Sequence, residues 1–341
     1  RDFTADAMAV ALLGRHNGEW ELIDPHGGCT DTRNRVLRAV SKNVFQADPA
    51  RLMRAVRLAA TLKFSLHSET ASQIRIDSPR VHSVSPERVR EELLKTLAED
   101  GARDSIRLLD NLGLLSCIIP ELEETRGVSQ PKEHYWNVFE HMVETVDYLE
   151  QILDQRPAAR VISQLMPRFE GMRDHFAEEV SDGHNRRTLL KLTGLLHDIA
   201  KPRTKTIEES GRMRFFGHSE EGAHIVSSVL RRLRFGKRGI RLITTMIRHH
   251  LRPTQMAQGD ALPTSRAVNR YFRDLGEAAL DTLYLNMADF LGARGPDLTE
   301  TQMHEHSKVF AHILEVGLQS GSTHTTAARL INGNDIMAQF K

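Results

Sequence analysis

The segment LLHDIAKP, at residues 195–202, places a histidine and an aspartate at the end of an apolar helical run. Leucines recur every three or four residues before this pair, which predicts a helix with one buried face. Burying His197 and Asp198 costs free energy unless partners satisfy their polar atoms. The fold must therefore either leave the pair at the surface or bring a binding partner to it.

Histidine is unusually common in this chain, with 17 residues, and several histidines and aspartates share helix faces with apolar residues. One such residue on a half-apolar face is more often a hydrogen-bonded core residue than a ligand. Groups from five predicted helices together favour a shared binding site. The candidates are His141, His197 with Asp198, His218, His250 and Asp289.

Imidazoles and carboxylates together form a ligand set for a divalent metal ion. They suit Mn, Fe, Co, Ni, Zn or Mg, whereas a thiolate-type zinc site would need clustered cysteines. Such an ion acidifies a bound water and polarises a phosphoryl oxygen. Lys201, one turn past His197, would then hold a phosphate as a point charge.

The order of these residues carries a resemblance. His141, then His197 and Asp198 in the context HDIAKP, then Asp289 resemble the H…HD…D pattern of the HD superfamily of metal-dependent phosphohydrolases. The resemblance implies a helical domain around one or two divalent metals that hydrolyses phosphoesters. It does not choose among cyclic nucleotides, phosphomonoesters and nucleoside triphosphates as substrates.

Two further histidines resemble the additional ligands of the superfamily's two-metal members. They are His218 and His250, with His224 and His249 as competing positions in the same segments. The resemblance implies one metal on the H…HD…D residues and a second metal on the added histidines. We predict Lys201, His218 and Asp198 as the catalytic residues.

The hydrophobic period is helical from residue 48 onward, and only the first residues read as strands. Residues 8–24 predict a hairpin about Asn17-Gly18. Helix starts are expected at Asp48-Pro49 and Ser85-Pro86, where a capping residue precedes proline. The chain is therefore predicted to be mainly α. Its expected units are a β-containing piece at 1–46, a helical neck at 47–125, an all-helical domain at 126–300 and the start of a helical tail at 301–341.

Four motifs follow one another at compact spacing in the first part of the chain: RDFTADAMA, LIDPHGG, ADPARLMRAVRLAATLKF and SVSPERVREELLKTL. Together they resemble bacterial class II tRNA nucleotidyltransferases and poly(A) polymerases, which add CCA or A to RNA 3′ ends and include members with an HD domain after the neck. The resemblance implies that Arg1 and Asp2 hold the nucleotide ribose, and that Asp48 and Arg51 read the incoming base. A carboxylate and a guanidinium one turn apart can imitate a pairing base edge; the alternative is an ordinary surface ion pair.

Three features depart from that family. Asp6 stands where the family usually has Asn, and Ala47 where it has an acidic residue. The sequence also contains no Asp-x-Asp, the pair of carboxylates that would hold Mg²⁺ for nucleotidyl transfer. We therefore interpret residues 1–46 as the end of a nucleotidyltransferase head, and expect nucleotidyl transfer only where the missing part of that head is present.

Composition restricts the partners only weakly. Lys and Arg number 46 against 45 Asp and Glu, so the net charge is nearly balanced. Only local basic patches can therefore indicate binding to a nucleic acid. The neck arginines and the stretch 231–241 are such patches, and a solvated helix face is the competing interpretation of the second. Two distant cysteines, Cys29 and Cys117, favour a reducing cytoplasm over a disulfide framework. The sequence contains no apolar run of about 18 residues, so it does not predict a membrane span.

The sequence thus predicts the neck and HD portion of a tRNA nucleotidyltransferase or poly(A) polymerase family protein. Its expected ligands are one or two divalent ions (Mn, Ni, Co, Fe or Mg), nucleotide and the tRNA 3′ end. Its expected activity is hydrolysis of phosphoesters such as 2′,3′-cyclic phosphates at RNA ends. The alternatives are an RNA-binding module with a structural metal site and an HD hydrolase of free nucleotides. CCA versus poly(A) specificity and the oligomeric state stay open.

Overall fold

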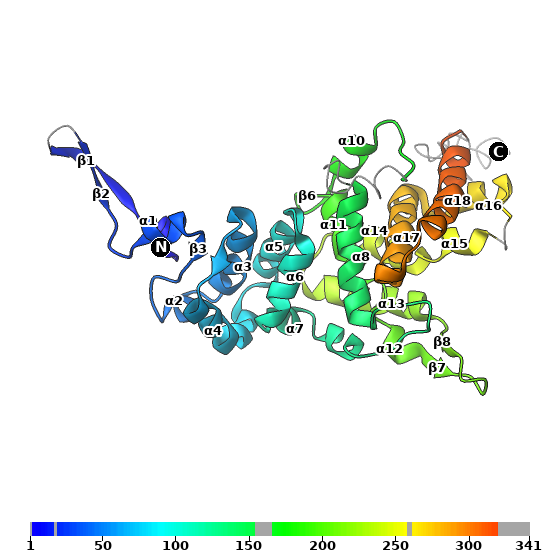
Figure 1. Cartoon of the computed structure of the whole chain (residues 1–341), viewed down its shortest axis with the longest axis horizontal. Coiled ribbons are helices and arrows are strands. Elements are labelled where there is room, and N and C mark those ends of the chain that lie inside the picture. The colour runs from blue at the N-terminus through cyan, green and yellow to red at the C-terminus, as the bar shows by residue number, and fades with distance from the viewer. Residues whose placement is uncertain (1, 17–18, 154–165, 258–260, 320–341) are drawn as a thin grey trace, which may run out of the picture.

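The computed structural model describes residues 2–16, 19–153, 166–257 and 261–319. The fold is mainly α, as the sequence predicts, and the elements follow one another along an elongated molecule (Figure 1). The helices of the first part are α1 (Gly28–Arg33), α2 (Val44–Ala47), α3 (Ala50–Leu62), α4 (Ser68–Asp77), α5 (Pro86–Ala98), α6 (Ala102–Asn111) and α7 (Leu114–Ile118). The later helices are α8 (Val138–Leu153), α10 (Met172–Ala177), α11 (Arg186–Leu196), α12 (Lys201–Thr204), α13 (His218–Arg232), α14 (Lys237–His249), α15 (Arg252–Met256), α16 (Ser265–Leu275), α17 (Ala279–Arg294) and α18 (Glu300–Gln319).

The described strands are short and form four two-stranded sheets. The antiparallel pair β1 and β2 is the hairpin predicted for residues 8–24, and its turn, Asn17-Gly18, lies outside the described residues. It protrudes at one end of the molecule in Figure 1. The strands are β1 (Ala9–His16), β2 (Glu19–Ile23), β3 (Val36–Leu37), β4 (Ser65–Leu66), β5 (Glu179–Ser181), β6 (His184–Asn185), β7 (Lys205–Ile207) and β8 (Met213–Phe215).

Two of these sheets lie in the region 126–300, for which we predicted helices alone. β5 pairs with β6 through a turn in which Asp182 and Gly183 both have positive φ, at 57° and 76°. Asp-Gly is the preferred sequence of such a hairpin turn, because both central residues need that conformation. β7 pairs with β8 in the same antiparallel manner. The two hairpins are small additions to a helical domain.

The helices α3 and α5 begin at or next to the predicted positions. α3 begins at Ala50, one residue later than expected, because Pro49 occupies the N-cap position. Oδ1 of Asp48 still accepts a hydrogen bond from the backbone N–H of Ala50, at 3.1 Å. Ser85 and Pro86 take the predicted N-cap and first positions of α5. α3 packs against α5, and α5 against α6.

Two helices form the centre of the second half of the molecule. Ten of the 11 residues of α11 are buried, and α17 is buried along most of its length. α8 packs against both of them, α14 also packs against both, and α13 packs against α14. This burial belongs to a protein core: no described helix has the length and apolar character needed to cross a membrane. The arrangement points the ends of several helices at one place.

Candidate metal centre

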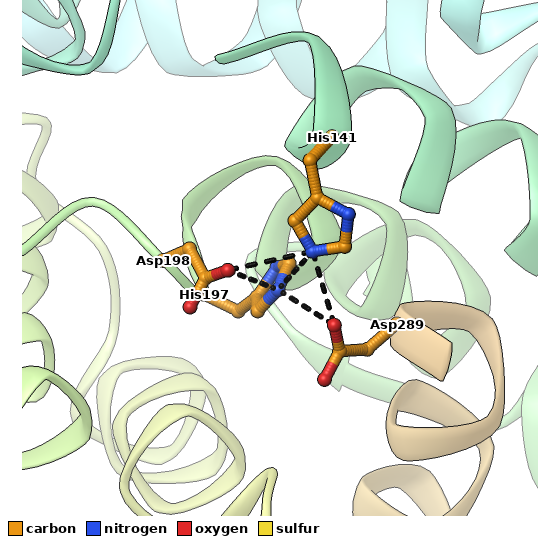
Figure 2. A group of neighbouring side chains, drawn as sticks. All are labelled: His141, His197, Asp198 and Asp289. Atoms are coloured by element: carbon orange, nitrogen blue, oxygen red, sulfur yellow. Dashed lines mark hydrogen bonds and ion pairs between the residues drawn. The ribbon is translucent and has the colours of Figure 1, made fainter. Parts of the chain in front are cut away.

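Four of the predicted metal ligands meet between α8, α11 and α17 (Figure 2). His141 lies in the first turn of α8, His197 and Asp198 follow the last residue of α11, and Asp289 lies on α17. All four are buried, with Asp289 the most exposed at 9%. The end of α11 therefore delivers a histidine and an aspartate into the core rather than to the surface.

The ligand atoms of this group lie close enough to share one ion. Nε2 of His141 is 3.0 Å from Oδ1 of Asp289 and 3.4 Å from Oδ2 of Asp198. Nε2 of His197 is 3.2 Å from that same Asp198 oxygen and 3.6 Å from the Asp289 oxygen. The two imidazole nitrogens are 3.3 Å apart. Two nitrogens and two oxygens thus surround one point.

A second group shares Asp198 with the first. Nε2 of His218, the first residue of α13, is 3.4 Å from Oδ1 of Asp198. Nε2 of His250, which directly follows α14, is 3.7 Å from the same oxygen and 3.4 Å from Nε2 of His218. The two carboxylate oxygens of Asp198 therefore face two different sets of histidines. Asp198 could therefore contribute one oxygen to each of two ions.

Backbone hydrogen bonds orient three of the four histidines. In His197, His218 and His250, Nδ1 lies 2.9, 2.6 and 2.7 Å from the carbonyl oxygen three residues earlier. A carbonyl accepts only, so Nδ1 carries the proton and the lone pair of Nε2 points at the centre. The three rings thus present Nε2 to the centre.

The electrostatics of the centre call for a cation. Burial opposes ionisation, yet the surrounding histidines and Lys201 hold the pKa of Asp198 well below its usual range, and His141 and His197 do the same for Asp289. Burial also lowers the pKa of His197, but Asp198 and Asp289 outweigh it and raise that pKa to about 10.

Unsatisfied atoms support the same conclusion. Both carboxylate oxygens of Asp198 are buried: Oδ2 pairs with the ammonium of Lys201 at 2.6 Å, whereas Oδ1 faces His218 and His250 and has no hydrogen-bond partner among the described residues. A buried carboxylate oxygen without a donor is costly unless it binds a positive charge. The mixed nitrogen and oxygen set therefore fits one or two divalent ions of the kind predicted.

Lys201 lies beside the centre and is bound to it. Its Nζ is 2.6 Å from Oδ2 of Asp198 and donates to Oε1 of Gln130 at 2.7 Å. We expected this lysine to hold a phosphate; in the structure two of its three N–H groups face partners in the chain. Gln130 was missed because its segment reads as a linker from sequence alone.

His134 is a second neighbour that the sequence reasoning missed. Its ring centroid is 5.5 Å from that of His141, and burial, with Lys201 and His141 nearby, lowers its pKa to about 3. The N–H of the next residue donates to the carbonyl oxygen of Ala293 at 2.7 Å, which anchors the segment to α17. His134 lies before the start of α8 at Val138, so its approach to His141 follows from the path of the chain and not from helical spacing.

The competing histidines lie outside both groups. His224 is 68% exposed and pairs with Glu220 at 3.4 Å. His249 is adjacent to His250 in sequence but contributes no atom to either described group. Helix geometry explains the difference, because neighbouring residues on a helix point about 100° apart.

The predicted nucleotide-binding residues also come together in part. Asp2 pairs with Arg51 at 2.7 Å and with Arg54 at 3.1 Å. Asp48 pairs instead with Arg88, at 3.0 Å, so Asp48 and Arg51 each have another partner. Arg1 lies outside the described residues. The first motif and the neck helix are therefore in direct contact.

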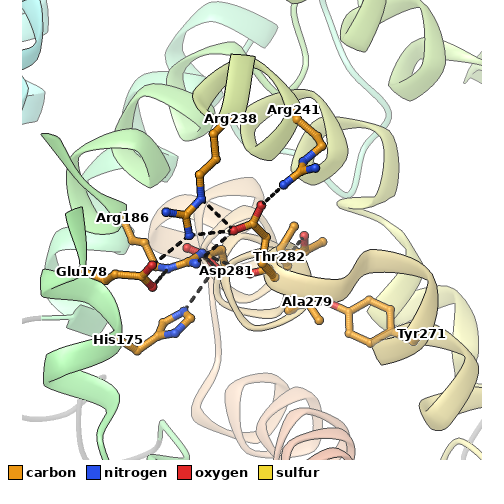
Figure 3. A network of polar contacts seen from close by, with 11 residues as sticks. His175, Glu178, Arg186, Arg238, Arg241, Tyr271, Ala279, Asp281 and Thr282 are labelled. Atoms are coloured by element: carbon orange, nitrogen blue, oxygen red, sulfur yellow. Dashed lines mark hydrogen bonds and ion pairs between the residues drawn. The ribbon is translucent and has the colours of Figure 1, made fainter. Parts of the chain in front are cut away.

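Three of the six basic residues in the stretch 231–241 form ion pairs within the described part of the chain. Figure 3 shows Arg238 and Arg241 of α14 directed at acidic groups of neighbouring elements. Both pair with Glu277, at 2.9 and 2.6 Å, and Arg232 pairs with Glu121 at 2.7 Å. These ion pairs favour the interpretation of this stretch as a structural helix face over a site for RNA.

Comparison with protein families finds two matches. The probable RNA and SrmB-binding site of polymerase A matches residues 63–125, and the HD domain matches residues 138–291. The second match contains all six predicted metal ligands. The domain boundaries that we placed after residues 46, 125 and 300 stay predictions.

Curated relatives extend over more of the chain. An A-adding tRNA nucleotidyltransferase of Deinococcus radiodurans is 31% identical over 344 residues, which cover 99% of this chain and 69% of that protein. A CC-adding tRNA nucleotidyltransferase of Thermus thermophilus is 31% identical over 273 residues, which cover 78% of this chain and 54% of that protein. The chain thus spans between half and about two thirds of these relatives.

Solved structures show the same fold. A CCA-adding enzyme in complex with ATP superposes with a TM-score of 0.58 at 18% identity, covering 99% of this chain and 64% of that one. The Thermotoga maritima CCA-adding enzyme complexed with tRNA gives a TM-score of 0.55 at 18% identity, covering 99% of this chain and 63% of that one.

Proposed function

The chain belongs to the tRNA nucleotidyltransferase family, and we propose that its HD domain is a metal-dependent phosphohydrolase acting on phosphoesters at RNA 3′ ends, such as 2′,3′-cyclic phosphates. HD domains and nucleotidyltransferases use divalent metals, and the buried histidines and aspartates of this chain can hold such ions. Removing a terminal cyclic phosphate would prepare an RNA end for nucleotide addition.

One observation carries the proposal: the two oxygens of Asp198 face two separate sets of histidines. His141, His197, Asp198 and Asp289 would hold one ion, and His218 and His250 a second. When bound, such ions supply a Lewis acid and an acidified water at the phosphorus. A single structural ion would not need the second set.

The residues around the ligands orient and charge the centre. Lys201 keeps Asp198 ionised, and its remaining N–H can donate to a phosphoryl oxygen. The ring of His218 faces Asp198, and the carbonyl oxygen of Phe215 holds it in that orientation by accepting a hydrogen bond from Nδ1. Asp198, His218 and Lys201 therefore remain the proposed catalytic residues.

The neck would bind the nucleotide and the tRNA end. Asp2 on the first motif and Arg51 on α3 meet at 2.7 Å, so the parts expected to contact ribose and base adjoin each other. Two of the solved structures similar to this chain are described as complexes with ATP and with tRNA. By this likeness we assign RNA and nucleotide as the partners of this chain.

The test is hydrolysis of 2′,3′-cyclic AMP by metal-stripped protein resupplied with Mn²⁺, Ni²⁺, Co²⁺ or Mg²⁺. We expect turnover to require metal and to disappear in Asp198→Asn, which keeps the shape of the side chain but removes the charge. His250→Gln should lower kcat/KM at least about tenfold and reduce the metal bound per chain.

The adjacent histidine supplies the matched control. His249→Gln should retain wild-type turnover and metal content, because His249 lies outside both ligand groups. Absence of turnover with every metal, in folded protein that still binds metal, would overturn the proposal in favour of an RNA-binding module with a structural site. Turnover of free nucleotides but not of a cyclic phosphate on an RNA end would favour the nucleotide hydrolase.

A further inference from the structure

Two exposed aromatic side chains lie close in sequence to residues of the metal centre. Among the described side chains that are large, apolar and exposed, two are aromatic: Tyr135, at 52%, and Phe216, at 72%. Tyr135 follows His134, which lies against His141, and Phe216 stands two residues before His218. Both exposed side chains therefore belong to segments that also carry a residue at the candidate centre.

The backbone next to Phe216 is fixed to the centre. The carbonyl oxygen of Phe215 binds Nδ1 of His218 at 2.6 Å, and the ammonium of Lys201 lies 5.6 Å from the centroid of the Phe215 ring. Phe215 thus packs toward the lysine that holds Asp198. Phe216, its neighbour in the chain, is exposed.

The segments that carry the two exposed rings are joined by lysines. Lys201 donates to Gln130 at 2.7 Å, and Nζ of Lys205 on β7 donates to Oγ of Ser129 at 3.0 Å. The segment before α8 and the hairpin β7–β8 therefore form adjoining parts of the rim. Lys205 has a neutral partner there, so its positive charge is available to a phosphate.

The ring of Phe216 is oriented although it is exposed. The guanidinium carbon of Arg214 lies 5.6 Å from its centroid, and Arg214 is in turn paired with Glu208 at 3.0 Å. An aromatic ring beside basic side chains is the combination that single-stranded nucleic acids bind, through stacking and phosphate contacts.

We propose that Phe216 is a substrate-binding residue that stacks on the terminal base of a single-stranded RNA whose 3′ phosphoester lies at the metal centre. The inference rests on the proposed hydrolase and names its substrate class as a base-bearing strand end. Because every base has an aromatic face, the contact accepts any terminal base. The basic groups of the rim complement the phosphates of such a strand.

Stacking is measured first, without hydrolysis. A short oligoribonucleotide with 2-aminopurine at its 3′ end is titrated into metal-stripped protein, and fluorescence quenching reports stacking. We expect quenching with wild type and with Phe216→Trp, and its loss in Phe216→Ala. Ile207→Ala is the matched control, because Ile207 is 67% exposed on the same hairpin and lies farther along the chain from His218.

Kinetics supply the second measurement. The ratio of kcat/KM for 2′,3′-cyclic AMP to that for glycerol 1,2-cyclic phosphate, which has no base, should fall about tenfold in Phe216→Ala and recover in Phe216→Trp. Wild-type quenching in Phe216→Ala would overturn the inference. If the protein hydrolyses neither compound, the proposed hydrolase fails and the quenching experiment still decides whether Phe216 stacks on RNA.

Discussion

At the scale of single residues, His306 of α18 is held in an unusual environment. Its ring stacks on Phe290 with the centroids 3.8 Å apart and the planes at 3°. The guanidinium carbon of Arg294 lies 4.2 Å from the Phe290 centroid. Burial, reinforced by Arg294 and opposed by Asp289, lowers the pKa of His306 to about 4. Folding therefore disfavours protonation of this histidine.

The sign of the resulting pH dependence follows. Between pH 6.5 and about 4 the unfolded chain binds a proton here that the folded chain does not, so the free energy of unfolding falls as the pH is lowered. His306→Phe keeps a ring on Phe290 and removes the titration. We expect this variant to lose less stability than wild type between about pH 7 and about pH 5, measured by urea unfolding.

The same helix offers a control for that experiment. His304 is exposed, so His304→Gln should keep the wild-type pH dependence. Equal losses of stability in wild type and His306→Phe would show that the stacked histidine titrates normally in the folded protein.

At the scale of elements, the metal centre depends on how closely α8 and α17 approach. A Cβ on Gly292 would lie 2.9 Å from Oγ1 of Thr145 and 3.3 Å from its backbone nitrogen. Thr145 stands one turn after His141, and Gly292 nearly one turn after Asp289, and these two ligands are 3.0 Å apart. A side chain at 292 would push the two ligand-bearing helices apart.

We therefore expect Gly292→Ala to destabilise the protein by about 1–3 kcal/mol and to weaken metal binding. Urea unfolding and the metal bound per chain measure the two effects. Gly222→Ala on α13 is the control, because its added Cβ would meet Ile247 at an ordinary 3.4 Å and alanine favours a helix. Full metal binding in Gly292→Ala would contradict this account of the helix contact.

At the scale of the whole molecule, a buried ion pair joins the neck to the helices of the metal centre. Nζ of Lys191 on α11 is 2.6 Å from Oε1 of Glu150 on α8, and both side chains are buried. Lys191 also donates to two carbonyl oxygens at the end of α5, at 2.8 and 2.9 Å. Oε2 of Glu150 accepts two backbone N–H groups at the start of α6, at 3.1 Å each. This one ion pair thus satisfies backbone groups at the end of α5 and at the start of α6.

Removing one partner should leave the other charge buried. We expect Lys191→Met to lower the free energy of unfolding by about 3–5 kcal/mol, because Glu150 would lose its cation. Lys95→Met, which breaks the exposed pair of Lys95 with Glu91, should cost less than about 1 kcal/mol. Urea unfolding compares the two variants. A similar small loss of stability in both would show that the contact between the neck and the metal-centre helices does not depend on the pair of Lys191 with Glu150.

Much of this protein is determined by its sequence alone. The helical period, the Ser85-Pro86 helix start and the hairpin at residues 8–24 predict elements that the structure contains, because capping and periodicity are local. The order of His141, His197, Asp198 and Asp289 identifies the HD family, since that chemistry needs those residue types. The Asp182-Gly183 dipeptide is also a local signal for a hairpin turn, and we did not predict the hairpin from it.

Only the tertiary structure decided how these residues meet. It places His218 and His250 at the centre rather than His224 and His249, and it brings Gln130 to Lys201 across 71 positions of sequence. It also pairs Asp2 with Arg51 and separates the two oxygens of Asp198 between two sets of histidines. The physical reason is that local pattern sets which face of a helix is buried, whereas the packing of distant helices sets which side chains share a point.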